Sequence, residues 1–258
     1  SVLHKHQRGS SNEATMASWL AKARDAGIRK VNLDFMYGLS GQDESTIRQD
    51  LELISRLKPQ QVILYELRPN MISAEQTFSK EALYGQYAQY HDGLIALGYK
   101  ARFGQNTFSV NASDEGVSSY LRERMLYGAA YKGFGLSAQS MSSAGIAYNL
   151  GKMAALPQEE INTDGYPEQF TYLLPKRELT SKYVAISAYN GSFSISRLRG
   201  IGVDDSLLNE ILGFCIDEGL LYKGEQDRVF VTRKGFEHYG ALFSLFYPNN
   251  QFGQEEAE

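Results

Sequence analysis

The first hundred residues alternate between amphipathic segments and short apolar runs, and this alternation constrains the fold more than any other feature. The pattern predicts, in order, a helix over 12–26, a strand over 31–37, a helix over 44–57, a strand over 61–67, a helix over 79–97 and a strand over 99–108. Helices that alternate with strands are typical of a parallel sheet covered by helices, so we expect an α/β fold. Because a helix comes first, with no strand before it, we expect the sheet to lack its beginning.

Composition limits the classes of function. Lys and Arg number 26 against 30 Asp and Glu, and a net charge of −4 gives no reason to expect nucleic acid. The sequence has no apolar run of about 18 residues, and the polar, basic residues 1–8 lack the apolar region of a signal peptide, so we expect a cytoplasmic protein without a membrane span. Cys215 is the only cysteine, which excludes an intrachain disulfide and an all-cysteine metal site, and the four histidines form no metal-ligand cluster.

The character of the sequence changes after the first 150 residues. Residues 111–165 are irregular and rich in glycine, and 151–167 are expected to form a linker. Beyond it, a helix over 204–218 and a hairpin that pairs 220–223 with 228–232 resemble a winged-helix arrangement. We therefore expect a partial barrel over 1–150, a winged-helix-like α+β domain over 168–248 and a disordered polar tail over 249–258.

Basic residues near the predicted C-terminal helix invite a DNA-binding interpretation. Arg197 and Arg199 precede this helix, and Arg233 and Lys234 follow the hairpin. However, the helix itself is acidic, and an acidic helix repels the phosphates of a DNA groove. The sequence therefore favours a small packing or lid domain.

Asp34 is the residue whose position most suggests a ligand. It lies within the apolar run 31–37, where an unpaired buried carboxylate is costly, so it must be solvated, paired or bound to a ligand. Ligands of parallel α/β folds gather at the carboxyl ends of the strands. An exposed acid at the sheet edge is the alternative, and the residue pattern leaves both readings open. Gly38 and Gly41, which follow the strand, favour an ordinary strand-to-helix turn over a ligand-binding loop.

Residues 32–42, with the sequence NLDFMYGLSGQ, are similar to the N-[IL]-D-L-[IM]-Y-G-L-P-x-Q segment of oxygen-independent coproporphyrinogen III oxidases, a family of radical S-adenosylmethionine (SAM) proteins. Phe35 stands where the family usually has leucine, and Ser40 where it has proline. The resemblance continues through short matches along nearly the whole chain, at 58–66, 98–99, 133–141, 219–221 and 231–235.

The resemblance implies the second half of a partial (β/α) barrel and a SAM site. It implies that Asp34 and Arg8 contact SAM, that the backbone of Leu67 meets it, and that Gln139 falls at a further SAM position that is usually apolar in the family. The family cleaves SAM reductively at a [4Fe–4S] cluster to form a radical that abstracts hydrogen. Its CxxxCxxC cluster motif is absent here, so we expect a truncated portion of such an enzyme that is inactive alone.

The resemblance implies a small-molecule substrate and an unidentified reductant protein, and it leaves several functions open. Coproporphyrinogen III decarboxylation in heme synthesis is the primary interpretation. Residues 64–70 depart from the family pattern, which makes a radical SAM C-methyltransferase of natural products the main alternative. Heme degradation is another alternative, as is a non-enzymatic heme-binding or chaperone module. Half a barrel would also leave a strand edge unpaired, which predicts self-association.

Overall fold

The structure of the chain is a computed structural model. The structure describes residues 12–67, 78–111, 123, 129–135, 137–142, 145–149, 169–173, 175, 178–188, 190–225 and 227–247. The predicted linker 151–167, the predicted tail 249–258 and Arg8 lie outside the described residues. Within the described residues, no helix is long and apolar enough to cross a membrane.

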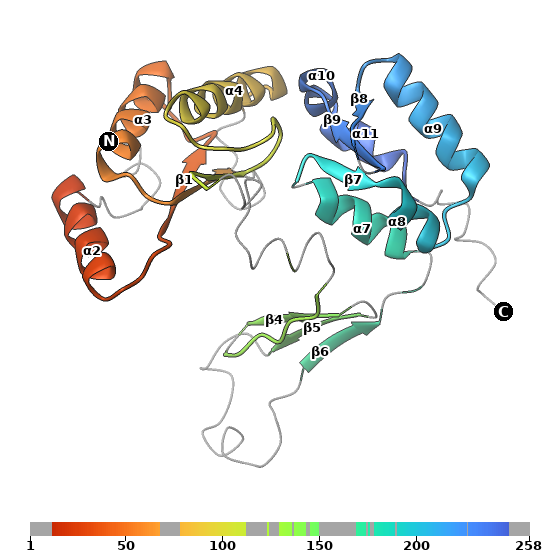
Figure 1. Cartoon of the computed structure of the whole chain (residues 1–258), viewed down its shortest axis with the longest axis horizontal. Helices are drawn as coiled ribbons and strands as arrows, with labels where there is room; N and C mark the ends of the chain where they lie inside the picture. Colours follow the sequence, from red (N-terminus) through yellow and green to blue (C-terminus); the bar gives the residue numbers. More distant parts are fainter. Residues whose placement is uncertain are drawn as a thin grey trace, which may run out of the picture.

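The first part of the chain forms the predicted helices and two parallel strands (Figure 1). Strand β1 (Asn32–Tyr37) pairs in parallel with β2 (Gln61–Glu66), with Asp34 opposite Ile63. The helices of this part are α2 (Glu13–Asp25), α3 (Glu44–Leu57) and α4 (Lys80–Ala96). Side chains of Asn12, Asp43 and Ser79 accept hydrogen bonds from the first turns of these helices, which fixes where each helix begins.

The prediction of a third parallel strand over 99–108 is wrong. Strand β3 covers only Thr107–Ser109 and pairs with β2 in the antiparallel direction, giving the sheet order β1-β2-β3. The chain reverses just before β3, where Gly104 has φ 92° and the amide of Gln105 donates to the carbonyl of Arg102. Periodicity alone does not detect this reversal, because the residues on both sides of the turn have strand-like composition.

The two faces of this sheet differ in character. Alternate residues of the strands pack against α3 and α4 in a buried cluster: Phe35, Tyr37, Val62, Leu64, Phe108, Ile47, Ile54, Tyr87, Tyr90 and Leu94. The other face, which we call the open face, carries Asn32, Asp34 and Met36 of β1 beside Ile63 and Tyr65 of β2. These five side chains are exposed or half-buried. The alternation of side chains along a strand thus separates a core from an accessible surface.

A second sheet lies apart from the first in Figure 1. It is antiparallel, in the order β4-β5-β6, and consists of β4 (Gln139–Met141), β5 (Gly145–Asn149) and β6 (Gln169–Leu173). The sequence predicted irregular structure for residues 111–165, so β4 and β5 were missed. Both strands are short, and β5 finds its second partner 20 or more residues away along the chain, which local periodicity does not reveal.

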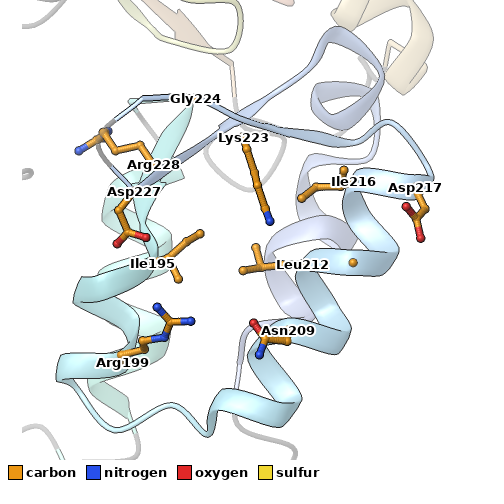
Figure 2. A pocket seen from close by; sticks show the side chains of 11 residues that line it. Ile195, Arg199, Asn209, Leu212, Ile216, Asp217, Lys223, Gly224, Asp227 and Arg228 are labelled. Atoms are coloured by element: carbon orange, nitrogen blue, oxygen red, sulfur yellow. The ribbon is translucent and has the colours of Figure 1, made fainter.

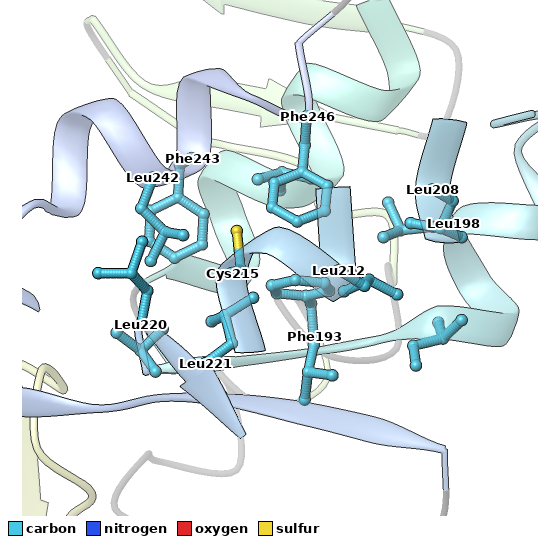
Figure 3. Packing of buried hydrophobic residues seen from close by; sticks show 14 residues of the cluster. Phe193, Leu198, Leu208, Leu212, Cys215, Leu220, Leu221, Leu242, Phe243 and Phe246 are labelled. Atoms are coloured by element: carbon cyan, nitrogen blue, oxygen red, sulfur yellow. The ribbon is translucent and has the colours of Figure 1, made fainter. Parts of the chain in front are cut away.

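The C-terminal part encloses a third sheet and its own core. Its elements are α7 (Glu178–Ala188), β7 (Ser192–Ser194), α8 (Ile195–Gly200), α9 (Asp205–Asp217), β8 (Leu221–Lys223), β9 (Arg228–Val231), α10 (Arg233–Glu237) and α11 (Tyr239–Ser244). Strand β9 lies between β7 and β8. Figure 3 shows Phe193, Leu212, Cys215 and Phe246 packed together in this core. Helix α9 and the antiparallel pairing of β8 with β9 confirm the predicted helix over 204–218 and the predicted hairpin.

Helix α10 joins the C-terminal part to α4. Arg233 donates two hydrogen bonds to Asp92, at 2.5 and 3.2 Å, and its guanidinium lies 4.3 Å from the ring centre of Phe103. Phe236 packs on the rings of Phe103 and Tyr87, with centroid distances of 5.4 and 4.7 Å. The ion pair of Arg233 with Asp92 and the aromatic contacts of Phe236 thus hold the C-terminal part and α4 in one relative orientation.

His91 is a titratable group buried at this junction. It is 7% exposed and lies against the rings of Tyr87 and Phe103. Burial lowers the pKa of His91 below its ordinary value of 6.5, although a hydrogen bond with Asp92 opposes this shift and the charge of Arg233 adds to it. The folded chain therefore binds fewer protons at this site than the unfolded chain does.

We expect the free energy of unfolding to fall as the pH drops below about 6.5, because the unfolded state then gains a proton that folded His91 resists. Urea titrations at several pH values measure this slope. His91→Phe should make the slope shallower, whereas His238→Gln, a change at an exposed histidine, should leave it as in the wild type. An unchanged slope in His91→Phe would contradict the assignment.

Candidate functional site

The open face carries Asp34 near its centre. The carboxylate is exposed and accepts a hydrogen bond from Asn32 Nδ2 at 2.5 Å. Met36 on the same strand and Tyr65 on β2 flank it on this face. An accessible carboxylate beside apolar and aromatic side chains can bind an ammonium group or the hydroxyls of a ribose, since a charged acceptor forms the stronger class of hydrogen bond. Asp34 is exposed, and this placement leaves both readings open: a carboxylate that contacts a ligand, and an exposed acid on the sheet.

Leu67 follows the carboxyl end of β2, which lies beside the carboxyl end of β1. Its amide donates to the carbonyl of Tyr37 at 2.9 Å, so its N–H group is already used within the fold. Next to it, the hydroxyl of Tyr37 donates to Glu66 at 3.2 Å. Burial, and next the charge of Glu66, raise the pKa of Tyr37 far above its ordinary value. The phenol therefore stays protonated and acts as a fixed hydrogen-bond donor at this edge.

The turn after β1 uses its own amides internally. Gly38 has φ 80°, and its amide donates to Gln86 Oε1 at 2.8 Å. The amide of Leu39 donates to Gln42 Oε1 at 3.3 Å. These amides are therefore satisfied by glutamine side chains, as in an ordinary strand-to-helix turn, which agrees with the reading that the sequence favoured.

A buried polar network supports this turn from behind. Gln42 Nε2 donates to the carbonyl of Met36 and to the hydroxyl of Tyr90, each at 3.0 Å. The Tyr90 hydroxyl in turn donates to Asp50. Burial raises the pKa of Asp50, although the hydrogen bond from Tyr90 opposes this shift, and burial also raises the pKa of Tyr90. The network links α3, α4 and the end of β1, so it fixes the turn that follows the strand of Asp34.

Sequence reasoning missed Gln42, Gln86 and Tyr90 as supports of the site. Gln42 belongs to the segment that resembles the coproporphyrinogen oxidase family, so a signal for it was present. Gln86 and Tyr90 stand in a helix whose buried face includes polar residues, and helical periodicity does not distinguish a buried glutamine from an exposed one.

Of the other two residues assigned to SAM by resemblance, the structure describes Gln139 and not Arg8. Gln139 lies on β4, in the second sheet, where its amide Nε2 donates to the hydroxyl of Tyr148 at 2.7 Å and its Oε1 accepts from Tyr131. Arg8 lies outside the described residues. The structure thus brings Asp34 and Leu67 to neighbouring strands, while Gln139 takes part in a tyrosine network elsewhere.

The described residues do not fit an iron–sulfur cluster. None of them forms a group of three or more His, Cys, Asp or Glu side chains that could hold a metal ion. Cys215 is fully buried in the C-terminal core, and burial raises the pKa of its thiol to about 11. Cluster ligation requires accessible thiolates, so this cysteine is a packing residue.

Searches of family models and of curated proteins found no match. Among solved structures, coproporphyrinogen III oxidase (HemN) from Escherichia coli, described as a radical SAM enzyme, matches with a TM-score of 0.69 and 18% sequence identity. The alignment covers 95% of this chain and 61% of that one, so the chain spans less than two thirds of the length of its structural relative. The chain therefore shares the mixed α/β fold of coproporphyrinogen III oxidase over nearly all of its length.

Proposed function

We propose that this chain forms the SAM-binding edge and the accessory C-terminal part of a radical SAM enzyme. The observation that carries the proposal is the exposed carboxylate of Asp34 on the open face. The chain around it shares the fold of a radical SAM enzyme. The resemblance of residues 32–42 to the coproporphyrinogen oxidase segment supports the same assignment.

In this proposal, Asp34 binds the ammonium group or the ribose hydroxyls of SAM. Met36 and Tyr65 offer apolar contact beside it, and the Gln42 network holds the neighbouring turn in place. Bound SAM would supply radical chemistry on receiving one electron from a cluster. That cluster needs ligands other than the described residues of this chain, so no step of the reaction is assigned to them.

Asp34→Asn is expected to weaken the binding of SAM to this chain about tenfold, because it removes one charge-assisted contact. Isothermal titration calorimetry of the purified chain with SAM measures this effect. Asp25→Asn, the same chemical change at an exposed position at the end of α2, should bind SAM as the wild type does. Equal affinities for Asp34→Asn and the wild type would contradict the assignment of Asp34.

We further propose that the reaction is oxidative decarboxylation of a porphyrinogen substrate, and the shared fold with a coproporphyrinogen III oxidase supports this substrate class. A radical SAM methyltransferase and a non-enzymatic heme-binding module are the alternatives that the test must separate. Anaerobic reconstitution of the complete gene product with iron, sulfide, a reductant and SAM is the experiment that separates them. SAM cleavage with consumption of coproporphyrinogen III supports the proposal. Cleavage with methyl transfer favours the methyltransferase, and heme binding without SAM cleavage overturns the radical SAM assignment.

A further inference from the structure

A cleft opens in the C-terminal part, away from the open face. It lies between α8, α9 and the β8–β9 hairpin and has a volume of about 580 Å³ (Figure 2). This volume is within the range of small-molecule sites, roughly 300–1,000 Å³. Ile195, Leu212 and Ile216 supply apolar surface to it. The cleft therefore offers apolar contact to a ligand of small-molecule size.

Two cations face this apolar surface from opposite sides. In Figure 2, Lys223 extends from the hairpin into the cleft, and Arg199 points toward it from α8, beside Asn209 of α9. Arg199 uses its Nε in a 2.6 Å bond to Asp205, which leaves its terminal nitrogens as further donors. Lys223 is exposed at the mouth of the cleft.

The remaining charged residues of the lining are held at its edges. The carboxylate of Asp227 accepts from the amide of Ser196 at 2.5 Å, and Arg228 donates to Ser192 Oγ at 2.6 Å. Asp217 lies at the outer side of α9 in Figure 2. Arg199 and Lys223 are the cations that point into the cleft, and an anionic group is the ligand that these two suit.

Gly213 is a second, independent feature that points to a ligand in this cleft. It lies inside α9, where glycine is about 1 kcal/mol less favourable than alanine. Its φ is not in the left-handed region, and a Cβ built on it would meet no atom within 4 Å. Neither the backbone nor the packing therefore requires glycine here. Because Gly213 lines the cleft, its missing side chain leaves the cleft open.

We propose that this cleft binds a small organic anion. The apolar body of the ligand lies on Ile195, Leu212 and Ile216, and its acidic group is bound by Lys223 and Arg199. Gly213 keeps the space for that body free. This site is separate from the proposed SAM edge and does not depend on it.

The probe that matches this chemistry is 8-anilinonaphthalene-1-sulfonate, an anion with an apolar ring body, and N-phenyl-1-naphthylamine is its neutral counterpart. Fluorescence titration of the full chain should show saturable binding of the anion that is tighter than binding of the neutral compound. Lys223→Gln should weaken binding of the anion about tenfold and leave binding of the neutral compound unchanged. Lys100→Gln, the same change at an exposed lysine of the first part, should have no effect.

Gly213→Leu should fill the cleft and abolish binding of both compounds without lowering the melting temperature, since leucine favours a helix over glycine. Gly213→Ala should raise the melting temperature and show that the helix tolerates a side chain. Gly85→Leu in α4, where a Cβ also meets no atom within 4 Å, is the matched control and should bind the probe as the wild type does. Absence of saturable binding in the wild type, or unchanged binding in Lys223→Gln and Gly213→Leu, overturns the proposal.

Discussion

Gly235→Ala is expected to destabilise the C-terminal part by about 3 kcal/mol, which corresponds to a drop of roughly 12–24 °C in the melting temperature of a part of this size. A Cβ at this buried position in α10 would lie 2.1 Å from the carbonyl oxygen of Leu220. That oxygen already accepts from the amide of Thr232 at 3.0 Å, and Thr232 Oγ1 caps α10 by accepting from the amide of Gly235 at 2.9 Å. The methyl group therefore meets backbone that is fixed on both sides, so relief requires α10 and β8 to move apart.

Thermal unfolding followed by circular dichroism measures this effect. Gly240→Ala is the matched control, because a Cβ there meets no atom within 4 Å, and it should leave the melting temperature unchanged or raise it. A Gly235→Ala variant as stable as the wild type would show that α10 does not pack against Leu220 as described.

Gln42→Leu is expected to lower the free energy of unfolding by about 2–4 kcal/mol, because it leaves more than one buried polar group without a partner. Gln42 is 5% exposed and serves the amide of Leu39, the carbonyl of Met36 and the hydroxyl of Tyr90. Leucine offers none of these contacts. These hydrogen bonds hold the turn that follows the strand of Asp34. We therefore expect Gln42→Leu to weaken SAM binding as well.

Urea titration gives the stability, and calorimetry with SAM gives the binding. Gln49→Leu, the same change at an exposed position of α3, should alter neither quantity substantially. If Gln42→Leu were as stable as Gln49→Leu, the network behind the turn would contribute nothing to the fold.

The sequence predicted the first part of the fold well where local signals were strong. The cap residues Asn12 and Asp43 and the apolar spacing set α2 and α3, and two β-rich runs set β1 and β2. Asp34 stood out because a carboxylate inside an apolar run is unusual. Its exposure follows from strand alternation, since its neighbours Leu33 and Phe35 face the opposite side of the sheet.

The elements that the sequence did not predict depend on contacts between distant segments. The direction of β3 is set by the turn at Gly104, and the second sheet forms when β5 pairs with β6 across a long separation. The network around Tyr90 also joins residues 40 or more positions apart. Such pairings leave no local periodicity, so propensity and spacing do not reveal them.

Hydrogen exchange of the chain with and without SAM tests the SAM-binding edge most directly. We expect saturating SAM to slow exchange of the amides in β1 and β2, from Asn32 to Tyr37 and from Gln61 to Leu67, because a bound ligand stabilises the state that binds it. Amides of α9 and of the β8–β9 hairpin should exchange at unchanged rates. Unchanged exchange in β1 and β2, or protection confined to the C-terminal part, would contradict a SAM site on the open face.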